Sequence, residues 1–531
     1  MAKGQRGQVW RRDADSGIGL EEMVRRVGEH VNRILRENLY EMDLNEAQLN
    51  RLARQKKELR ENLARCGVGD EAAKAYVLEF LQESLLRLFA LSERSIDEVF
   101  YYKERERENA EFLFDRLLYL YKKKHGKDAV RALVEENGLL CGEGRICAQD
   151  IRAVYARRGR TLSFVEKVEL LTWKVYSAYR GLGVIDELRD MNIDGVSGGV
   201  SGQPGDYHSV WMFYEGRSVH LEFLDFGGER ELERICRSIC RFEQPGELSR
   251  ARGYIVHEMA DHARVVVARP DFAESWMFFV RKLGAGGKRS LSELFPQPGA
   301  SRAAELLGWL VKGCQVVGIT GMQGCGKTTL LMALVESIPP EYTLRVLELA
   351  FELHLRRWYP KRNIVTFRET ESIGGWEGLE LQKKTDGAVS IIGEVASARV
   401  AAWMVESGQT GALFTLFTHH ARTTRALILS LRNALLKEGS FSSERVATEQ
   451  VVSVVNFDVH LHLSREGSRY IERITQIIEN PRVPEGYELM DLLVCEDGVY
   501  RQKNRLPLAT RREMERWMSE EEKEAFRIAD L

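Results

Sequence analysis

The sequence predicts an α/β fold in which a parallel α/β domain follows a smaller α+β domain and an α-helical region. Strands and helices alternate from Cys314 to Thr418, which is typical of a largely parallel sheet. Before that part, short strand-like runs are separated by one helical segment, and the first 160 residues carry apolar side chains at helical spacing. The expected boundaries are 1–160 for the helical region, 161–283 for the α+β domain, 284–298 for a linker, 299–504 for the parallel α/β domain and 505–531 for a charged helical tail.

Composition and charge exclude two classes of protein. The chain has 77 Lys and Arg against 79 Asp and Glu, a formal net charge of −2, and 44% of its residues are hydrophobic. A protein that coats nucleic acid usually carries a basic excess, and a disordered chain is poorer in apolar residues. We therefore expect a folded protein with no direct nucleic-acid partner.

Two further patterns concern the compartment. No run approaches the about 20 apolar residues that a membrane-spanning helix needs, and no apolar stretch follows the basic start MAKGQRGQVWRR. The 8 cysteines form no Cys-x-x-Cys pair, which favours reduced structural thiols. These patterns predict a cytoplasmic protein.

The helical region is predicted from its periodicity. Leu20, Met23, Val24 and Val27 recur at the spacing of one helical face. Segments dense in Arg and Glu, such as ARQKKELREN, are expected to be solvated helix faces, and a docking surface for an acidic partner is the alternative.

The α+β domain is predicted to follow the glycines and the proline that interrupt the helical pattern in GLGVIDELRDMNIDGVSGGVSGQPG. The runs SVWMFY, SVHLEFL, ARVVVA and WMFFV have strand character, and ERELERICRSICRF has helical character. The next segment, GAGGKRSLSELFPQPGAS, concentrates glycine, proline and serine. We expect it to be a linker that contains a short helical turn.

The parallel α/β domain is predicted from the strand-like runs CQVVGIT, TLRVLEL, AVSIIGEV and GALFTLFT, with the helix GKTTLLMALVESI after the first run. The segment VHLHLSREGSRYIERITQII predicts a hairpin that turns at residues 465–468. A second hairpin is predicted in LLVCEDGVYRQ, with its turn at Asp497 and Gly498.

A phosphate-binding loop is predicted at residues 321–328, where GMQGCGKT fits G-x-x-x-x-G-K-[ST] between a strand and a helix. Glycines there let backbone N–H groups turn around a β-phosphate, while Lys327 is expected to reach the β- and γ-phosphates and the Thr328 hydroxyl to ligate Mg²⁺. ATP and Mg²⁺ are the expected cofactors. The expected binding residues of the loop are Gly321, Gly324, Gly326, Lys327, Thr328 and Thr329.

Catalysis at such a loop needs a carboxylate at the end of a neighbouring strand. Glu394, after the strand AVSIIG, is the first candidate, and Glu348, which ends TLRVLE, is the second. His420 follows the strand GALFTLFT and is expected at the same edge of the sheet; a purely structural histidine is the alternative. Adjacent strand residues point to opposite faces, so we expect His419 to face away and its replacement by alanine to leave turnover nearly unchanged.

Several of these segments, in their order, resemble the secretion ATPases of type II secretion, type IV secretion and type IV pilus systems, especially the Flp/Tad pilus branch. The resemblance covers about residues 160–500. GLGVIDELRDMNIDGVSGG is similar to the segment that opens the family's N-terminal domain, and ADHARVVVARP and FFVRKL are similar to its closing strands. RVLELAFELHL resembles the acidic box, SIIGEV the Walker B box, and residues 410–421 the histidine box. FDVHLHLSREGSRYIERITQI is similar to the family's closing strand and hairpin, with Asp458 and Arg469 on matching positions.

The chain also departs from the family's pattern. The acidic box continues with Leu349 where the family usually has aspartate, and Walker B continues with Ala396 where it usually has arginine. Ala412 stands at the first histidine of the histidine box and Arg422 at the asparagine that follows it. Each change removes a group that helps to position the γ-phosphate or to signal between subunits, so slow turnover is an open alternative.

The resemblance implies a homohexameric ring of RecA-like P-loop ATPase domains, each joined by a flexible linker to an α+β N-terminal domain. It implies that Glu394 orients the attacking water and that Arg264 and Arg281 reach the phosphates from the N-terminal domain; ordinary charges at a strand edge are the alternative for these arginines. The expected partner is an inner-membrane platform protein, with the ATPase cytoplasmic and peripheral at the membrane.

The leading functional hypothesis is thus an ATP-hydrolysing motor for assembly of a Flp/Tad-like type IV pilus or a type II or type IV secretion machine. The alternative is a nucleotide-binding structural or regulatory ring subunit with little hydrolysis. A DNA-translocating ATPase is a third hypothesis, which the near-neutral charge does not favour.

Overall fold

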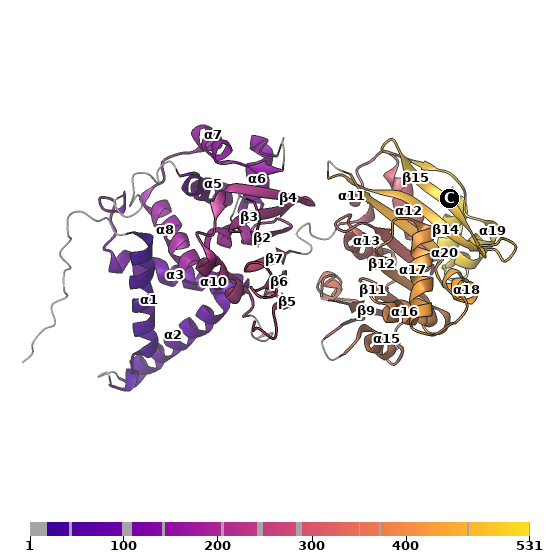
Figure 1. Cartoon of the computed structure of the whole chain (residues 1–531), viewed down its shortest axis with the longest axis horizontal. Coiled ribbons are helices and arrows are strands. Elements are labelled where there is room, and N and C mark those ends of the chain that lie inside the picture. Colours follow the sequence, from indigo (N-terminus) through magenta and orange to yellow (C-terminus); the bar gives the residue numbers. More distant parts are fainter. Residues whose placement is uncertain are drawn as a thin grey trace, which may run out of the picture. The chain divides into compact units, whose positions relative to one another are not determined.

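The computed structural model divides into two compact units, residues 1–282 and 283–531, each described here by itself (Figure 1). The structure describes residues 19–41, 45–97, 109–140, 144–202, 207–241, 248–282, 289–349, 351–370, 373–464 and 467–529. Part of the predicted linker, residues 284–288, and the turn residues Arg465 and Glu466 lie outside these ranges.

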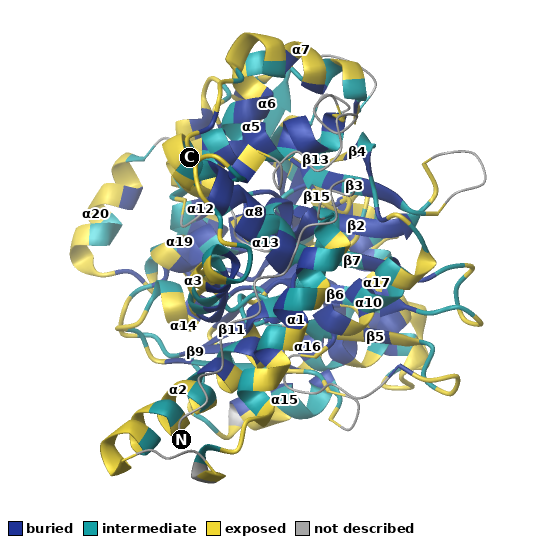
Figure 2. Cartoon of the chain, turned by 90° about the vertical axis from the view of Figure 1, so that its left-hand side faces the viewer, coloured by how far each residue is buried: buried dark blue, intermediate teal, exposed yellow. Residues whose placement is uncertain are grey.

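The first unit contains a group of helices with a core of their own. Helices α1, α3 and α8 pack together in Figure 1, and α2 joins them through its C-terminal half. The core between them contains Val27, Val77, Leu81, Val175 and Tyr176, all fully buried. Only Leu59 and Leu63 of α2 are buried, and Figure 2 shows the rest of that helix as half-buried or exposed surface. The bounds are α1 Leu20–Arg36, η1 Leu39–Glu41, α2 Glu46–Arg65, η2 Cys66–Val68, α3 Glu71–Leu88 and α8 Phe164–Tyr179.

A seven-stranded sheet forms the other part of this unit, with strand order β1-β4-β3-β2-β7-β6-β5. Apart from the parallel pair β1–β4, neighbouring strands run antiparallel. Residues from α5, α6, α7 and α10 share one core with the sheet. The strands are β1 Arg145–Ile146, β2 Gly195–Val200, β3 Ser209–Tyr214, β4 Arg217–Asp225, β5 Tyr254–Glu258, β6 Arg264–Ala268 and β7 Met277–Arg281. The helices are α5 Ala110–His125, η4 Gly126–Asp128, α6 Ala129–Asn137, α7 Ala148–Arg158, η5 Gly183–Ile185, α9 Asp186–Asp190 and α10 Glu229–Ile239.

Strand β2 was not predicted, because its sequence GVSGGV has neither alternation nor bulky side chains. The aromatic rings beside it explain the glycines. A Cβ atom on Gly198 would lie 2.3 Å from the ring of Phe226 and 2.7 Å from that of Phe278. Gly199 has φ 77°, and a Cβ atom there would lie 1.9 Å from the carbonyl oxygen of Trp276. Packing of these rings against the bare backbone therefore takes the place of the usual strand pattern.

The sheet and the helices packed on it contain segments from before and after residue 160. Strand β1 pairs with β4, and α5, α6 and α7 lie in the core of the sheet, although all four precede residue 160. Helix α8, which follows residue 160, lies in the core of the first helices. The unit therefore has two interlocked cores with no division of the chain between them at that residue.

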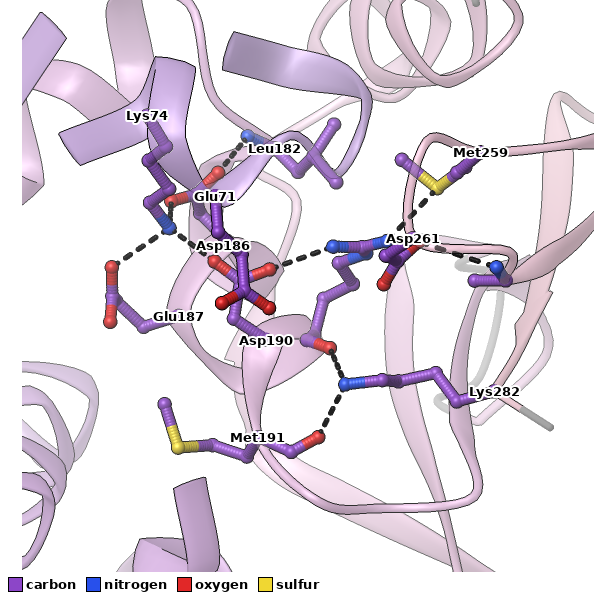
Figure 3. A network of polar contacts seen from close by, with 12 residues as sticks. Glu71, Lys74, Leu182, Asp186, Glu187, Asp190, Met191, Met259, Asp261 and Lys282 are labelled. Carbon is purple, nitrogen blue, oxygen red and sulfur yellow. Dashed lines mark hydrogen bonds and ion pairs between the residues drawn. The ribbon is translucent and has the colours of Figure 1, made fainter. Parts of the chain in front are cut away.

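A cluster of buried charges joins the two parts of this unit (Figure 3). Lys74 of α3 contacts three carboxylates of α9, with its Nζ 2.6 Å from Asp186, 2.9 Å from Glu187 and 2.6 Å from Asp190. Burial alone would lower the pKa of Lys74, but these carboxylates raise it well above its ordinary value. The ammonium of α3 is thus held by the acidic helix α9.

The second unit is built on a nine-stranded sheet of order β10-β9-β11-β12-β8-β13-β14-β15-β16. Strands β8 to β13 are parallel and take the first six places of this order, and β14, β15 and β16 continue the sheet antiparallel. The strands are β8 Val317–Gly321, β9 Leu344–Glu348, β10 Ile364–Arg368, β11 Val389–Ile392, β12 Phe414–His419, β13 Phe457–Leu463, β14 Arg469–Glu479, β15 Tyr487–Glu496 and β16 Val499–Gln502. Strand β12 lies between β8 and β11 in a sheet whose parallel part alternates with helices, so the predicted α/β class is confirmed.

Helices pack around this sheet and extend its core to the end of the chain. The bounds are α11 Leu291–Leu294, α12 Ala300–Lys312, α13 Lys327–Leu334, η6 Val335–Ser337, α14 Leu355–Trp358, α15 Gly375–Lys383, α16 Ala398–Thr410, α17 Thr424–Lys437, α18 Glu444–Val454, α19 Leu508–Glu515 and α20 Glu520–Ile528. The charged tail is anchored, since Met514 and Phe526 are fully buried and the ring of Phe526 packs on Trp309. Among the described helices of the whole chain, none is long and apolar enough to cross a membrane.

Candidate nucleotide-binding site

The predicted phosphate-binding loop joins the end of β8 to the start of α13. Gly321, Gly324 and Gly326 have positive φ angles of 139°, 80° and 100°, which favour glycine. At Gly321 space is short as well, because a Cβ atom would lie 2.4 Å from the carbonyl oxygen of Leu461 and 2.8 Å from the Sγ atom of Cys325. The glycine pattern read from the sequence therefore corresponds to a tight turn of the backbone.

Lys327 is buried at the first turn of α13, and its ammonium points back into the loop. Its Nζ donates to the carbonyl oxygens of Gly321 and Met322, both at 3.0 Å. Burial lowers the pKa of Lys327, more than the nearby Cys325 and Glu394 raise it. An anion bound at the loop would stabilise the charged form of this lysine.

The third donor of this ammonium faces His420. The distance from Lys327 Nζ to His420 Nδ1 is 3.4 Å, and His420 Nε2 lies 3.1 Å from Glu394 Oε1. Because an ammonium only donates, Nδ1 is the accepting nitrogen of a neutral ring, and Nε2–H then points to the carboxylate. The structure thus brings three of the predicted residues, Lys327, His420 and Glu394, into one chain of contacts.

Parallel strand pairing places these three groups at one edge of the sheet. Glu394 follows β11, His420 follows β12 and the loop follows β8, and these strands are consecutive neighbours. In open α/β sheets, ligands bind at the carboxyl ends of the strands, where such loops meet.

Glu348 ends β9 as expected, and its carboxylate bonds to the backbone of the loop that follows. It ends β9 and is buried, and its Oε1 accepts hydrogen bonds from the backbone N–H groups of Glu352 at 2.8 Å and Leu353 at 2.7 Å. A Cβ atom on Gly393 would lie 3.2 Å from Glu348 Cγ. The carboxylate therefore organises the loop after β9, next to the residue that precedes Glu394.

The start of α13 fits the groups that a nucleotide and its cation would need. Leu330 N is the first amide of this helix to bond within it, to Gly326 O at 3.0 Å, so the amides of 327–329 point along the helix axis. Thr328 is half-buried and Thr329 exposed at this end. The free amides and the Lys327 ammonium can donate hydrogen bonds to phosphate oxygens. The hydroxyl oxygen of Thr328 is a ligand suited to Mg²⁺.

Two residues that the sequence placed on matching family positions, without giving them a role, support the loop. Arg469 Nε donates to Gly324 O at 2.9 Å, which connects β14 to the loop. On β13, Asp458 is fully buried and accepts hydrogen bonds from the hydroxyls of Thr320 and Thr424, each at 2.6 Å. The structure thus adds a contact to each of these positions.

Thr320 also connects Asp458 to His460. The distance from Thr320 Oγ1 to His460 Nδ1 is 2.8 Å, and burial lowers the pKa of His460 to about 4. Because Thr320 donates to Asp458, the neutral ring donates to Thr320 through Nδ1–H. Burial raises the pKa of Asp458, and the two threonine hydrogen bonds oppose this shift.

The two predicted arginines belong to the first unit. Arg264 of β6 and Arg281 of β7 are paired directly opposite each other in the antiparallel register. Arg281 also lies over the ring of Phe213, 5.8 Å from its centroid. On its other side Arg264 is paired with Glu258 of β5, so a carboxylate and a second guanidinium flank this arginine in the register.

Two of the residues that depart from the family pattern lie at the carboxyl edge of the sheet. Leu349 is 38% exposed at the end of β9, and Ala396 is exposed just after Glu394. Ala412 is half-buried before β12 and so lies at the opposite edge. The carboxyl edge thus carries small or apolar groups at two positions where charged groups were expected.

Comparison with known proteins gives structural likenesses alone, since no family model and no curated protein matches the chain. The VirB11 ATPase of the Brucella suis type IV secretion system, solved with sulfate, is 18% identical; the match covers 54% of this chain and 89% of VirB11, with a TM-score of 0.30. The Legionella pneumophila ATPase DotB is 14% identical, with 59% and 80% covered and a TM-score of 0.37. The pilus retraction motor PilT, solved with ADP, is 14% identical, with 63% and 86% covered and a TM-score of 0.39.

Proposed function

We propose that this chain binds ATP with Mg²⁺ at the loop 321–328 and hydrolyses it. The observation that carries the proposal is the chain of contacts from Lys327 through His420 to Glu394 at one edge of a RecA-like sheet. A cation, an imidazole and a carboxylate gathered beside a phosphate-binding loop are the groups that hydrolysis of a γ-phosphoryl group needs.

The residues of the site have separate tasks in this proposal. The amides at the start of α13 and the loop cradle the phosphates, and Lys327 exchanges its two carbonyl partners for phosphate oxygens. Thr328 holds Mg²⁺, which when bound neutralises charge on the phosphates. Glu394 orients the attacking water and accepts hydrogen bonds from it, while His420 keeps the carboxylate beside the loop.

The wider role that we propose is that of a motor in a type IV (Flp/Tad-like) pilus or a type II or type IV secretion machine. Support comes from the order of the motifs from GLGVIDEL to the closing hairpin. The proposed assembly is a homohexamer in the cytoplasm, bound peripherally to the membrane through an inner-membrane platform protein.

In that ring, Arg264 and Arg281 bind the phosphates of a nucleotide. Their direct pairing on β6 and β7 supports this role, because it places two guanidinium groups, each suited to bind a phosphate through paired N–H donors, on adjacent strands. The arginines are thus the proposed contribution of the first unit to the site.

A structural or regulatory ring subunit that binds ATP with little hydrolysis is the second candidate. It is favoured by Leu349, Ala396 and Ala412, which have no charged or imidazole groups at positions where the family usually has them. Steady-state ATPase activity of the purified chain, measured together with ATP affinity, separates the two candidates. Turnover that depends on Glu394 supports the motor, whereas tight binding without turnover supports the structural subunit.

A further inference from the structure

Glu394 is held from both sides by the residues that precede His420. Strand β11 ends at Ile392, so the ladder between β11 and β12 does not reach Glu394. Beyond it, Thr418 Oγ1 donates to Gly393 O at 2.5 Å, and Val395 N donates to Thr418 O at 2.9 Å. These two bonds restrain the residue before Glu394 and the amide after it.

The third restraint comes from His419, the residue expected to face away. Its Nδ1 lies 2.8 Å from Val395 O, and its Nε2 lies 2.9 Å from the hydroxyl of Ser430 on α17. The ring therefore connects the backbone carbonyl of Val395, the residue after Glu394, to helix α17.

The partners of the ring determine its protonation. A carbonyl oxygen only accepts, so Nδ1 carries the proton, and Nε2 of the neutral ring accepts from the Ser430 hydroxyl. Burial lowers the pKa of His419, which favours the neutral ring. Both nitrogens are then occupied by partners within this unit, and neither is directed at Lys327 or His420.

A carboxylate that orients water must be placed accurately, since a displacement of about 1 Å can cost about 100-fold in rate. Glu394 lies on irregular backbone beyond the end of β11, and its side chain is about one-third exposed. Its position therefore depends on the bonds to Gly393 and Val395.

We propose that His419 is a positioning residue, which fixes the backbone carbonyl of Val395, the residue after Glu394, and so keeps the carboxylate beside His420. This inference rests on the proposed function, because it assigns His419 a task in the reaction of Glu394. It replaces the expectation that the substitution of His419 by alanine leaves turnover nearly unchanged.

The test compares His419→Ala, His419→Asn and His419→Gln with the parent chain. The asparagine amide nitrogen stands where Nδ1 stood and can still donate to Val395 O, whereas the glutamine amide reaches the position of Nε2. We expect His419→Ala and His419→Gln to lose at least about 10-fold in turnover while the affinity for a non-hydrolysable ATP analogue stays within about twofold. His419→Asn is expected to recover most of the turnover.

A second readout does not depend on hydrolysis. Hydrogen exchange of the backbone amides of residues 394–396 is expected to be faster in His419→Ala and His419→Gln, and near parental in His419→Asn. A parent without turnover would refute the proposed function, and the exchange data would still decide whether His419 holds this segment.

Three outcomes would overturn the inference. They are parental turnover in His419→Ala, equal defects in the asparagine and glutamine variants, and unchanged exchange at 394–396 in all variants. If the alanine variant does not fold, the comparison of asparagine with glutamine remains decisive.

Discussion

The carboxylate of Glu394 lies 3.1 Å from the imidazole of His420, although the two residues follow different strands. The contact exists because β11 and β12 are parallel neighbours and end at the same edge of the sheet. The proposed water-orienting group and its imidazole partner are therefore already together beside the loop, and each can be tested by a single substitution.

Glu394→Gln tests the carboxylate. Glutamine keeps the shape and most hydrogen bonds but removes the negative charge, so we expect turnover to fall at least about 100-fold. Affinity for a fluorescent ATP analogue should stay near the parental value. Glu438→Gln, at the exposed C-terminal end of α17, is the matched control. Unchanged turnover in Glu394→Gln would exclude this carboxylate as the catalytic group.

His420→Ala tests the imidazole. Because His420 bridges Lys327 and Glu394, we expect a loss of turnover of at least about 10-fold. The loss should not be rescued by asparagine, which cannot reach both partners. Steady-state kinetics with both variants are the measurement. Parental rates in both would favour the slow, structural subunit.

Lys327→Ala tests the loop. The ammonium is buried and donates to two carbonyl oxygens of the loop, so we expect its loss to abolish ATP binding or weaken it severely. Equilibrium titration with a fluorescent ATP analogue measures the loss. Lys437→Ala, at an exposed position on α17, should bind like the parent. Tight binding by Lys327→Ala would show that the phosphates lie elsewhere.

The opposed arginines predict a dependence of assembly on nucleotide. If Arg264 and Arg281 complete the site, ATP stabilises the assembled state, and light scattering should show a more compact or more fully hexameric species with ATP. Replacing both arginines by alanine should remove this response, because the guanidinium groups proposed to bind the nucleotide are then absent. A monomer with and without ATP, well above micromolar concentration, would contradict the ring.

His460 predicts a pH dependence of stability. Its pKa is about 4 in the folded unit against an ordinary 6.5, so below about pH 6.5 the unfolded chain takes up a proton that the folded chain does not. The contribution of His460 to the free energy of unfolding is therefore complete above that pH and is lost as the pH falls. Between pH 7.5 and pH 5 the loss amounts to about 2 kcal/mol.

His460→Asn keeps a donor for Thr320 and removes the titrating ring. Urea unfolding of parent and variant at both pH values gives the change in the free energy of unfolding for each protein. The difference between the two changes is due to His460, because the opposing contribution of Asp458 is common to both proteins. The variant should show a smaller loss at the lower pH. Equal losses in parent and variant would contradict the role of His460.

Much of the second unit could be predicted, because its signals are local. The runs TLRVLEL, AVSIIGEV and GALFTLFT became β9, β11 and β12, and the loop followed β8 as expected. Once the strands are parallel, Glu394 and His420 meet at one edge without further information. The hydrogen bonds of the Glu348 carboxylate were not predictable in this way, because its backbone partners Glu352 and Leu353 belong to an irregular loop.

Long-range contacts account for what could not be predicted. Strand β2 is specified by Phe226 and Phe278, which follow it in the chain and leave no pattern in GVSGGV itself. The second hydrogen bond of His419 depends on Ser430, which lies on helix α17. Such side chains look like ordinary polar residues until the fold brings their partners to them.

The contact between Lys74 and the acidic helix α9 has a consequence for how the first unit unfolds. Detaching α3 would leave Asp186, Glu187 and Asp190 near one another without the ammonium, and breaking a buried ion pair on one side costs about 3 to 5 kcal/mol. The helices before residue 160 and the sheet after it should therefore melt in one cooperative transition. A shortened chain that starts at residue 161 would lack a part of its own folding unit.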